Sequence, residues 1–190
     1  MNGKRLIAAL LSAALLAVPF VIPETAPAQM GATCAGVDAL PQSTTTAALG
    51  ESIRCLLNQH RASAGLGPLG RQGKLLHAAN AHAKDMVNHQ FVSHIGSNGS
   101  TPLSRVRRTG FLKGASFFAV GEDMAWGNSY EVTPASVVRA WMNSPVHRRN
   151  ILDKRFNRIG AGIVRGEPTT GGDSNVNTLT FVAVFAVVRH

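Results

Sequence analysis

The chain has 190 residues, of which 45% are hydrophobic and 15% are charged, and its formal net charge is +9 at pH 7. A chain of this length holds one domain with a real hydrophobic core. Beyond its first residues it has no uninterrupted apolar stretch long enough for a second membrane span, which excludes a protein that crosses the bilayer several times.

The first 28 residues have the pattern of a secretory signal peptide. Lys4 and Arg5 precede an apolar run from Leu6 to Val21, and the small residues of Ala26-Pro27-Ala28 follow as a cleavage site. The run holds 16 residues, fewer than the ~20 needed to span a bilayer. We therefore predict cleavage near Ala28 and an exported protein that is not transmembrane after cleavage, rather than an anchored one.

Removal of residues 1–28 takes away two basic residues and one acidic residue, so the net charge falls from +9 to +8. This balance favours anionic partners outside the membrane, such as cell-wall polymers, extracellular polysaccharide or lipid headgroups. Nucleic acid is not an expected partner of an exported chain. The alternative interpretation is a solvated basic surface that keeps a small exported protein soluble.

The chain has two cysteines, Cys34 and Cys55. Export makes a disulfide chemically possible, and the count is even. Two thiols 21 positions apart lack the ligand spacing of a metal site. We expect a disulfide that pins the N-terminal segment to the first helix.

Hydrophobic periodicity and turn residues predict the helices. Residues 29–45 are rich in Ala, Pro, Ser and Thr and are expected to lack regular structure, whereas residues 46–64 and 72–88 carry apolar stripes of helical spacing. Three further helices are expected where a hydroxyl residue precedes a proline, because the hydroxyl caps the helix and proline suits its first position. These pairs are Thr101-Pro102, Thr133-Pro134 and Ser144-Pro145.

Strands are predicted over residues 116–126, 158–165 and 178–188. In the last of these, both alternating faces are apolar, so the strand needs a covering layer on each side. We predict an α+β fold, an α-β-α sandwich with an antiparallel central sheet and helices on both faces. The folded domain is expected to span residues 46–190, after an extended segment over 29–45.

Three residues able to bind metal or move protons stand in distinctive segments. His94 follows a helix in a polar loop, Glu122 follows an apolar run that would carry it to the end of the sheet, and His147 falls in the first turn of its helix. The positive end of the helix dipole favours a neutral imidazole there, which is the form that binds metal and accepts protons. Spacing alone does not bring the three together.

The segments around these residues resemble the signature of the CAP superfamily, the cysteine-rich secretory, antigen and pathogenesis-related proteins, also called the SCP domain. The matching pieces are Phe91-Val92-Ser93-His94, Gly121-Glu122-Asp123, and Trp141 to Asn150 with its Ser-Pro-x-His-Arg-x-Asn pattern. The resemblance covers roughly residues 48–186 and is greatest to the short secreted bacterial branch. Asp123 stands where the family has Asn.

The resemblance implies that His94, Glu122 and His147 meet in a central cleft, with zinc as a candidate cofactor. A second Glu would complete the cleft in animal and plant members, but here Ser144 occupies its position, so the set is two histidines and one glutamate. Such a set with an open position suits zinc in principle. The alternative is a hydrogen-bonded polar cluster that organises the cleft.

Two functions follow from this likeness. The first is a secreted, non-enzymatic module that binds a lipid, a sterol or an anionic cell-surface polymer, through the cleft at His94, Glu122, Ser144 and His147 or through the basic surface. The alternative is a zinc-dependent hydrolase in which Glu122 and His147 would be the catalytic residues. No Gly-x-Ser-x-Gly element is present to support serine catalysis. The sequence gives no oligomeric state.

Overall fold

The structure is a computed structural model that describes residues 33–128, 132–169 and 178–190. The predicted signal peptide, residues 1–28, lies outside the described residues. The regular elements, in chain order, are a 3-10 helix η1 (Pro41–Ser43), α1 (Thr46–Ser63), β1 (Gly70–Arg71), α2 (Gly73–His89), α3 (Pro102–Arg108), β2 (Phe117–Asn128), α4 (Pro134–Asn143), α5 (Pro145–Ile151), β3 (Arg158–Arg165) and β4 (Thr178–Arg189). All five predicted helices and all three predicted strands are present within a few residues of their expected bounds.

The strands form one sheet in the order β1-β3-β4-β2. The three long strands pair antiparallel, as predicted, with β4 between β3 and β2. The short strand β1 was not predicted, and it pairs in parallel with the start of β3, so the sheet is mixed. Two residues are too few for an alternating pattern to be recognised in a sequence.

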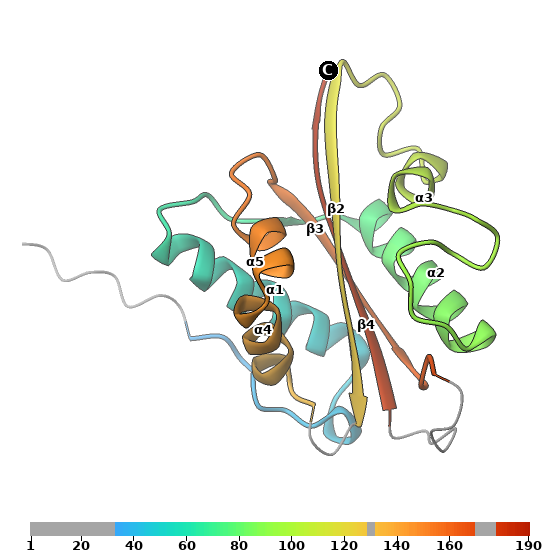
Figure 1. The fold of residues 1–190 in the computed structure, drawn as a ribbon. Helices are drawn as coiled ribbons and strands as arrows, with labels where there is room; N and C mark the ends of the chain where they lie inside the picture. Colours follow the sequence, from blue (N-terminus) through green and yellow to red (C-terminus); the bar gives the residue numbers. More distant parts are fainter. Residues whose placement is uncertain (1–32, 129–131, 170–177) are drawn as a thin grey trace, which may run out of the picture. The chain divides into compact units, whose positions relative to one another are not determined.

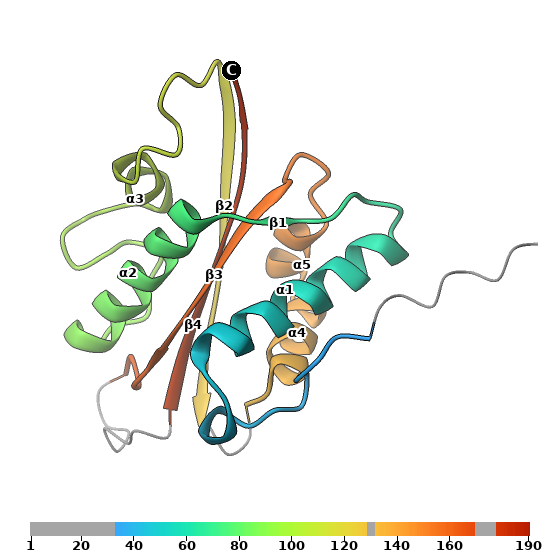
Figure 2. The same cartoon turned by 180° about the vertical axis from the view of Figure 1, so that it is seen from behind.

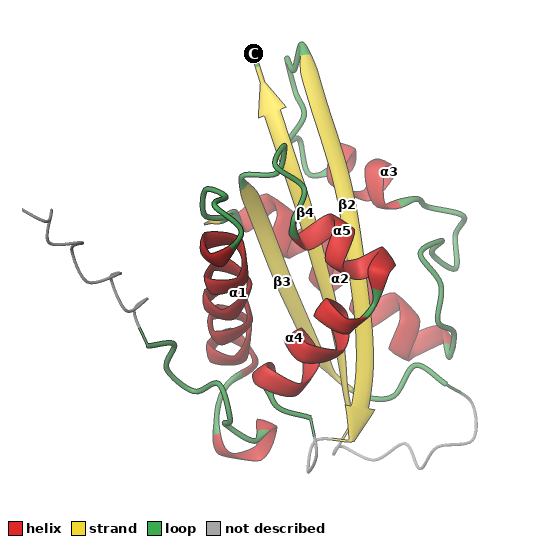
Figure 3. Ribbon diagram, turned by 60° about the vertical axis from the view of Figure 1, so that its left-hand side comes forward, coloured by secondary structure: helices red, strands yellow, loops and turns green. Residues whose placement is uncertain are grey.

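Helices cover both faces of the sheet, which confirms the α-β-α sandwich (Figure 1; Figure 2). On one face α1, α4 and α5 pack on Phe181, Ala183 and Phe185 of β4. On the other face α2 and α3 pack on the alternating residues Val182 and Val184. Figure 3 shows α4 and α5 in front of the sheet and α2 behind it. The strand with two apolar faces is therefore the centre of the core.

Two glycines let α2 approach the sheet closely. A Cβ added at Gly160 of β3 would overlap the backbone of Leu75 and Leu76, and one added at Gly162 would lie 2.6 Å from the backbone nitrogen of Asn80. The Gly-x-Gly spacing follows from strand alternation, since residues two apart point to the same face. This packing fixes α2, and with it the loop that carries His94.

The hydroxyl-proline pairs begin three helices, as predicted. The side chains of Thr101 and Thr133 each accept a hydrogen bond from the N3 backbone, and Ser104 and Ser136 complete reciprocal capping boxes. Ser144 is the residue before α5, but its side chain makes no capping hydrogen bond, so the expectation of a side-chain cap there is wrong. Ser144 also ends α4, and its backbone N–H bonds to the Trp141 carbonyl.

The N-terminal segment is tied to α1. Cys34 and Cys55 form the predicted disulfide, with their Cα atoms 5.7 Å apart. The segment predicted to be irregular contains the short 3-10 helix Pro41–Ser43, whose proline is buried. None of the helices in the described residues is long and apolar enough to cross a bilayer.

Candidate functional site

Two of the three candidate residues are in direct contact. Glu122 lies in the middle of β2, not at the end of the sheet as the sequence indicated, and its residue is only 5% exposed. His94 lies in the loop between α2 and α3, with its side chain half-exposed. The Nδ1 atom of His94 is 2.9 Å from Oε1 of Glu122. Because a carboxylate accepts, the Nδ1–H donates and Nε2 remains the free nitrogen of the neutral ring.

A buried arginine holds the Glu122 carboxylate from the other side. Arg105 of α3 is 5% exposed, and its Nη2 lies 2.9 and 2.8 Å from the two Glu122 oxygens. The same guanidinium donates to the backbone carbonyls of His94 and Ser100, at 3.0 and 2.7 Å. Arg105 thus ties the His94 loop to the middle of β2.

Arg105 is not among the candidate residues that the sequence indicated, so its role was missed. The available signal was Glu122 itself, because a carboxylate inside a strand needs a cation or several donors once it is buried. The side chain of His94 is half in solvent and contacts only one of the two Glu122 oxygens. The nearest basic cluster in sequence is the one that contains Arg105.

His82 of α2 completes the cluster. It is fully buried, and its Nε2 donates to the Ser93 carbonyl at 2.9 Å and lies 3.8 Å from Glu122 Oε1. Burial lowers the pKa of His82, which keeps the ring neutral. Its Nδ1 is buried and has no hydrogen-bond partner among the described residues.

Asp123, the neighbour of Glu122 on β2, points to the opposite face of the sheet. It is fully buried, and its Oδ1 accepts a hydrogen bond from Asn150 of α5 at 2.7 Å. Its Oδ2 has no partner within the described residues. Burial raises the pKa of the Asp123 carboxyl to about 7. The Asp123 carboxyl, which stands where the family has the amide of Asn, therefore holds a proton near neutral pH.

His147 is near His94 but is not joined to the cluster. It lies in the first turn of α5 and is partly buried. Burial, and then the positive charge of His94, lower the pKa of His147. Within the described part of the chain His147 forms no hydrogen bond to His94 or Glu122. The structure thus brings His94 and Glu122 into contact and leaves His147 within electrostatic reach of His94.

The donor atoms, as arranged, do not fit a zinc ion. Both oxygens of Glu122 are engaged by Arg105, so this carboxylate is not available as a ligand. In residues 33–128, 132–169 and 178–190, no group of three or more His, Cys, Asp and Glu side chains could hold a metal ion. We derive no chemistry through a metal, and zinc binding by His94 and His147 stays a prediction.

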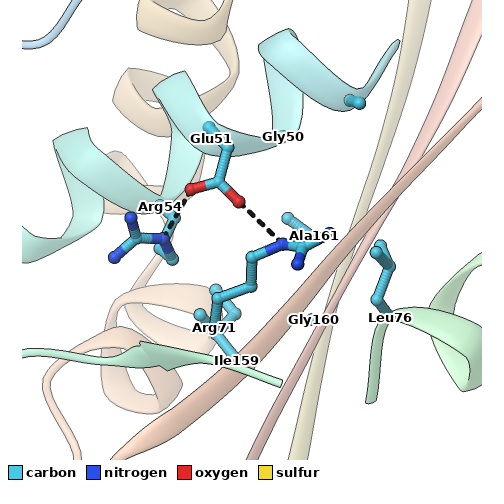
Figure 4. Close-up of a pocket in the computed structure, with 9 residues that line it drawn as sticks. Gly50, Glu51, Arg54, Arg71, Leu76, Ile159, Gly160 and Ala161 are labelled. Carbon is cyan, nitrogen blue, oxygen red and sulfur yellow. Dashed lines mark hydrogen bonds and ion pairs between the residues drawn. The ribbon is translucent and has the colours of Figure 1, made fainter. Parts of the chain in front are cut away.

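A separate hollow of about 310 Å³ lies between α1, β1, α2 and the start of β3 (Figure 4). Glu51 lies between two arginines there, with an oxygen 2.9 Å from Arg54 and the other 2.9 Å from Arg71. Gly50 and Ala161 line the hollow beside them. None of the candidate residues contributes to it, and its charges are already paired with one another.

A protein-family model matches most of the folded chain. The model of the cysteine-rich secretory protein family, CAP, matches residues 56–185. The chain belongs to the CAP family. The match includes the His94 loop, β2 and α5, so the cluster described above occupies the region that defines a CAP domain.

Two curated relatives come from Bacillus subtilis (strain 168). This CAP domain is 36% identical over 109 residues to the uncharacterized protein YkwD, which covers 57% of this chain and 40% of YkwD. It is 28% identical over 115 residues to the uncharacterized membrane protein YlbC, covering 60% of this chain and 31% of YlbC. The chain spans less than half the length of either relative.

Solved structures show the same fold. An extracellular protein containing an SCP domain from Bacillus anthracis matches with a TM-score of 0.59 and 23% identity, over 76% of this chain and 41% of that chain. An outer surface protein from Borrelia burgdorferi matches with a TM-score of 0.58 and 22% identity, over 72% of this chain and 90% of that chain. At these identities the likeness establishes the fold alone.

Proposed function

We propose that this CAP domain is an extracellular, non-enzymatic module that binds an anionic cell-surface polymer through basic side chains of α5 and the loop that follows it. Its relatives in known structures include an extracellular protein and an outer surface protein. The disulfide between Cys34 and Cys55 supports the same location, because such bonds persist in oxidising compartments.

The observation that carries the proposal is the uneven pairing of charges. Arg148, Arg149 and Lys154 are exposed, and within the described residues their side chains form no hydrogen bond or ion pair. The acidic side chains, in contrast, are mostly engaged: Glu51, Glu122 and Asp153 pair with arginines, Asp85 with Ser97 and His89, Asp123 with Asn150 and Glu167 with Thr169. The unpaired cations are left to attract an external polyanion.

The His94 cluster supports binding rather than catalysis. A general base must be able to reach the proton that it removes, but the Glu122 side chain is 1% exposed and both its oxygens face Arg105. The cluster holds the loop between α2 and α3 against β2 and is thereby part of the scaffold. Among the described residues, no contact of this cluster favours a zinc-dependent hydrolase, or a lipid or sterol held in the cleft.

Binding to short poly(glycerol phosphate) chains, a soluble phosphodiester polymer, tests the proposal. The protein purified from cells that express the full chain should bind the polymer in low salt and release it as salt screens the charges. Arg148→Glu should weaken binding by about tenfold, since a charge reversal on the binding surface replaces attraction with repulsion.

Lys84→Glu is the matched control. Lys84 is exposed on α2 and has no ion pair with another described residue, so this variant has the same net charge as Arg148→Glu but changes a different surface. Equal weakening by the two variants would mean that only net charge matters and that α5 is not the binding surface. A wild-type protein with no salt-sensitive affinity for the polymer would refute the proposal.

A further inference from the structure

The sheet ends in a two-stranded ribbon that β3 does not reach. The register between β2 and β4 runs to Phe117↔Arg189, whereas β3 pairs with β4 only as far as Ala186. Beyond that point the start of β2 and the end of β4 extend past the helices, at the top of Figure 1. We call residues 117–119 and 187–189 the ribbon end.

Two large aromatic side chains are exposed at the ribbon end. Phe117 is 41% exposed and Phe118 is 36% exposed. Because successive residues of a strand point to opposite faces, the two rings project from both sides of the ribbon. Each exposed ring leaves apolar surface in water on its own face of a protruding ribbon, and a partner that covers both faces would remove this unfavourable exposure.

Each ring lies beneath an arginine. The guanidinium carbon of Arg189 is 5.1 Å from the centroid of Phe117, and that of Arg107 is 5.7 Å from the centroid of Phe118. These are cation–π distances. Each pair presents an apolar ring and a positive charge side by side, on opposite faces of the ribbon.

The segments that form the ribbon end and lead into it are basic and contain no acid. The stretches 102–121 and 179–190 include no Asp or Glu. Arg108 and Lys113, which precede β2, add two exposed charges to those of Arg107 and Arg189, whereas Arg105 is buried and occupied by Glu122. These segments contain no acidic residue that could neutralise their exposed positive charges, which therefore suit a negatively charged partner.

We propose that the ribbon end is a docking surface for an anionic phospholipid bilayer. A hydrated polymer would take the charges but leave both rings in water, whereas the interface of a bilayer takes both. Phenylalanines can enter the boundary between headgroups and acyl chains while the arginines above them remain at the level of the phosphates. Several basic residues close to an anionic surface add to this attraction. This surface is distinct from the α5 surface of the proposed function, and either can fail alone.

Vesicle binding tests the inference. Protein purified from cells that express the full chain is mixed with vesicles of phosphatidylcholine alone or with added phosphatidylglycerol, and the bound fraction is measured by flotation. All variants carry the same N-terminal segment, so differences between them report the ribbon end. The wild type should bind the phosphatidylglycerol vesicles at least about tenfold better than the neutral ones.

Two double variants separate the rings from the charges. Phe117→Ser/Phe118→Ser keeps every charge and should reduce binding to anionic vesicles by about tenfold, and Arg107→Ala/Arg189→Ala keeps both rings and should reduce it by a similar factor. Arg148→Ala/Arg149→Ala is the matched control with the same loss of charge on α5, and it should retain most of its vesicle binding. Thermal melting of each variant checks that the exposed substitutions leave the fold intact.

A direct measure of insertion completes the test. Phe117→Trp places an indole at the ribbon end, and its emission should shift to shorter wavelength and be quenched by brominated lipids. Vesicle binding that is unchanged in Phe117→Ser/Phe118→Ser, or an indole that brominated lipids do not quench, would overturn the inference. So would equal loss in the ribbon and α5 arginine variants, or loss of poly(glycerol phosphate) binding in the ribbon variants. If vesicles bind as expected and the polymer does not bind at all, the proposed function fails while the inference stands.

Discussion

Among the described residues two arginines are buried, one on each side of the sheet, and they are satisfied in different ways. Arg61 of α1 is 1% exposed and donates to the carbonyl oxygens of Gly67, Ile151, Asp153 and Phe156, at 2.8 to 3.0 Å. Arg105 of α3 donates to two carbonyls as well, but it also pairs with the carboxylate of Glu122.

The difference shows what each arginine does for the fold. Arg61 is surrounded by peptide dipoles, and burial lowers its pKa, an effect that the negative charge of Asp153 partly opposes. It ties two connections to α1, the loop that follows α1 and the segment between α5 and β3, and has no single partner. Arg105 clamps one loop and also neutralises a buried acid, so its removal leaves a charge behind. No single second substitution could compensate for the loss of Arg61, whereas Arg105 and Glu122 form a pair that can be removed together.

Loss of Arg61 should have the largest effect. Arg61→Met leaves several buried carbonyl oxygens without a donor, and we expect the free energy of unfolding to fall by about 3–5 kcal/mol. Chemical denaturation measures this. Arg155→Met is the control, because Arg155 is an exposed arginine of the neighbouring loop, paired with Asp153 at the surface, and its loss should have a much smaller effect. Similar losses in the two variants would contradict the role assigned to Arg61.

Breaking the Arg105–Glu122 pair should cost less stability than the loss of Arg61, and a second substitution should restore part of it. Arg105→Met should lower the free energy of unfolding by about 2–4 kcal/mol, because it leaves the Glu122 carboxylate buried without a cation. Adding Glu122→Gln removes that charge, so the double variant should be more stable than Arg105→Met alone. A thermodynamic cycle over the two single variants and the double variant measures the coupling. Additive losses would mean that the pair does not act as a unit.

Most of the framework of the domain could be predicted from local patterns in the sequence. The strand over residues 178–189 has apolar residues on both faces, which requires two covering layers, and the Thr101-Pro102 and Thr133-Pro134 pairs mark helix starts by a mechanism that acts within four residues. These signals are local, so no tertiary information is needed to read them. The family resemblance then added what local patterns lack, the expectation that distant residues converge, and of the three candidates the structure brings His94 and Glu122 into contact.

The contacts that shape the site were outside the reach of such patterns. Arg105 and Glu122 are 17 positions apart on elements of different type, and no periodicity connects a helix to a strand. The burial of Asp123 depends on how α5 lies over β2, which is set by packing. The sequence also gives no sign that Ser144, although it stands before a proline, does not cap α5 with its hydroxyl. Its backbone N–H instead bonds to the end of α4. The pairing of charges is a property of the packed molecule.

Asp123 is a buried acid that, unlike Glu122, has no arginine paired with it within the described residues. Because its folded pKa of about 7 is above the ordinary value of 3.8, the folded state holds a proton that the unfolded chain releases between these values. Stability should therefore fall as pH rises from about 4 to about 7. This loss amounts to about 4 kcal/mol at pH 7.5. Asp123→Asn removes it but places an amide nitrogen where Oδ2 has no partner among the described residues, so the free energy of unfolding at pH 7.5 should rise by roughly 2 kcal/mol. Urea denaturation at several pH values measures it, and a wild-type stability that rises over this range in parallel with that of the variant would contradict the prediction.

The smallest effect is expected at His94, and it gives the finest test of the Arg105–Glu122 pair. The hydrogen bond to Glu122 raises the pKa of His94 above 6.5, while the charge of Arg105 lowers it. The stability that His94 contributes is fully present below pH 6.5 and is lost as the pH rises through the folded pKa. With the side chain 47% exposed, His94→Gln should cost less than about 1 kcal/mol even at low pH.

NMR titration of the His94 ring should therefore give shifts of opposite sign in two variants. Glu122→Gln should lower the pKa of His94 because it removes the acceptor charge, and Arg105→Met should raise it because it removes a nearby cation. Arg61→Met, on the other face of the sheet, should leave it unchanged wherever the protein remains folded. If the first two substitutions shift the His94 pKa in the same direction, the ring does not sense the two charges separately, and the pair is not the organising contact of this loop.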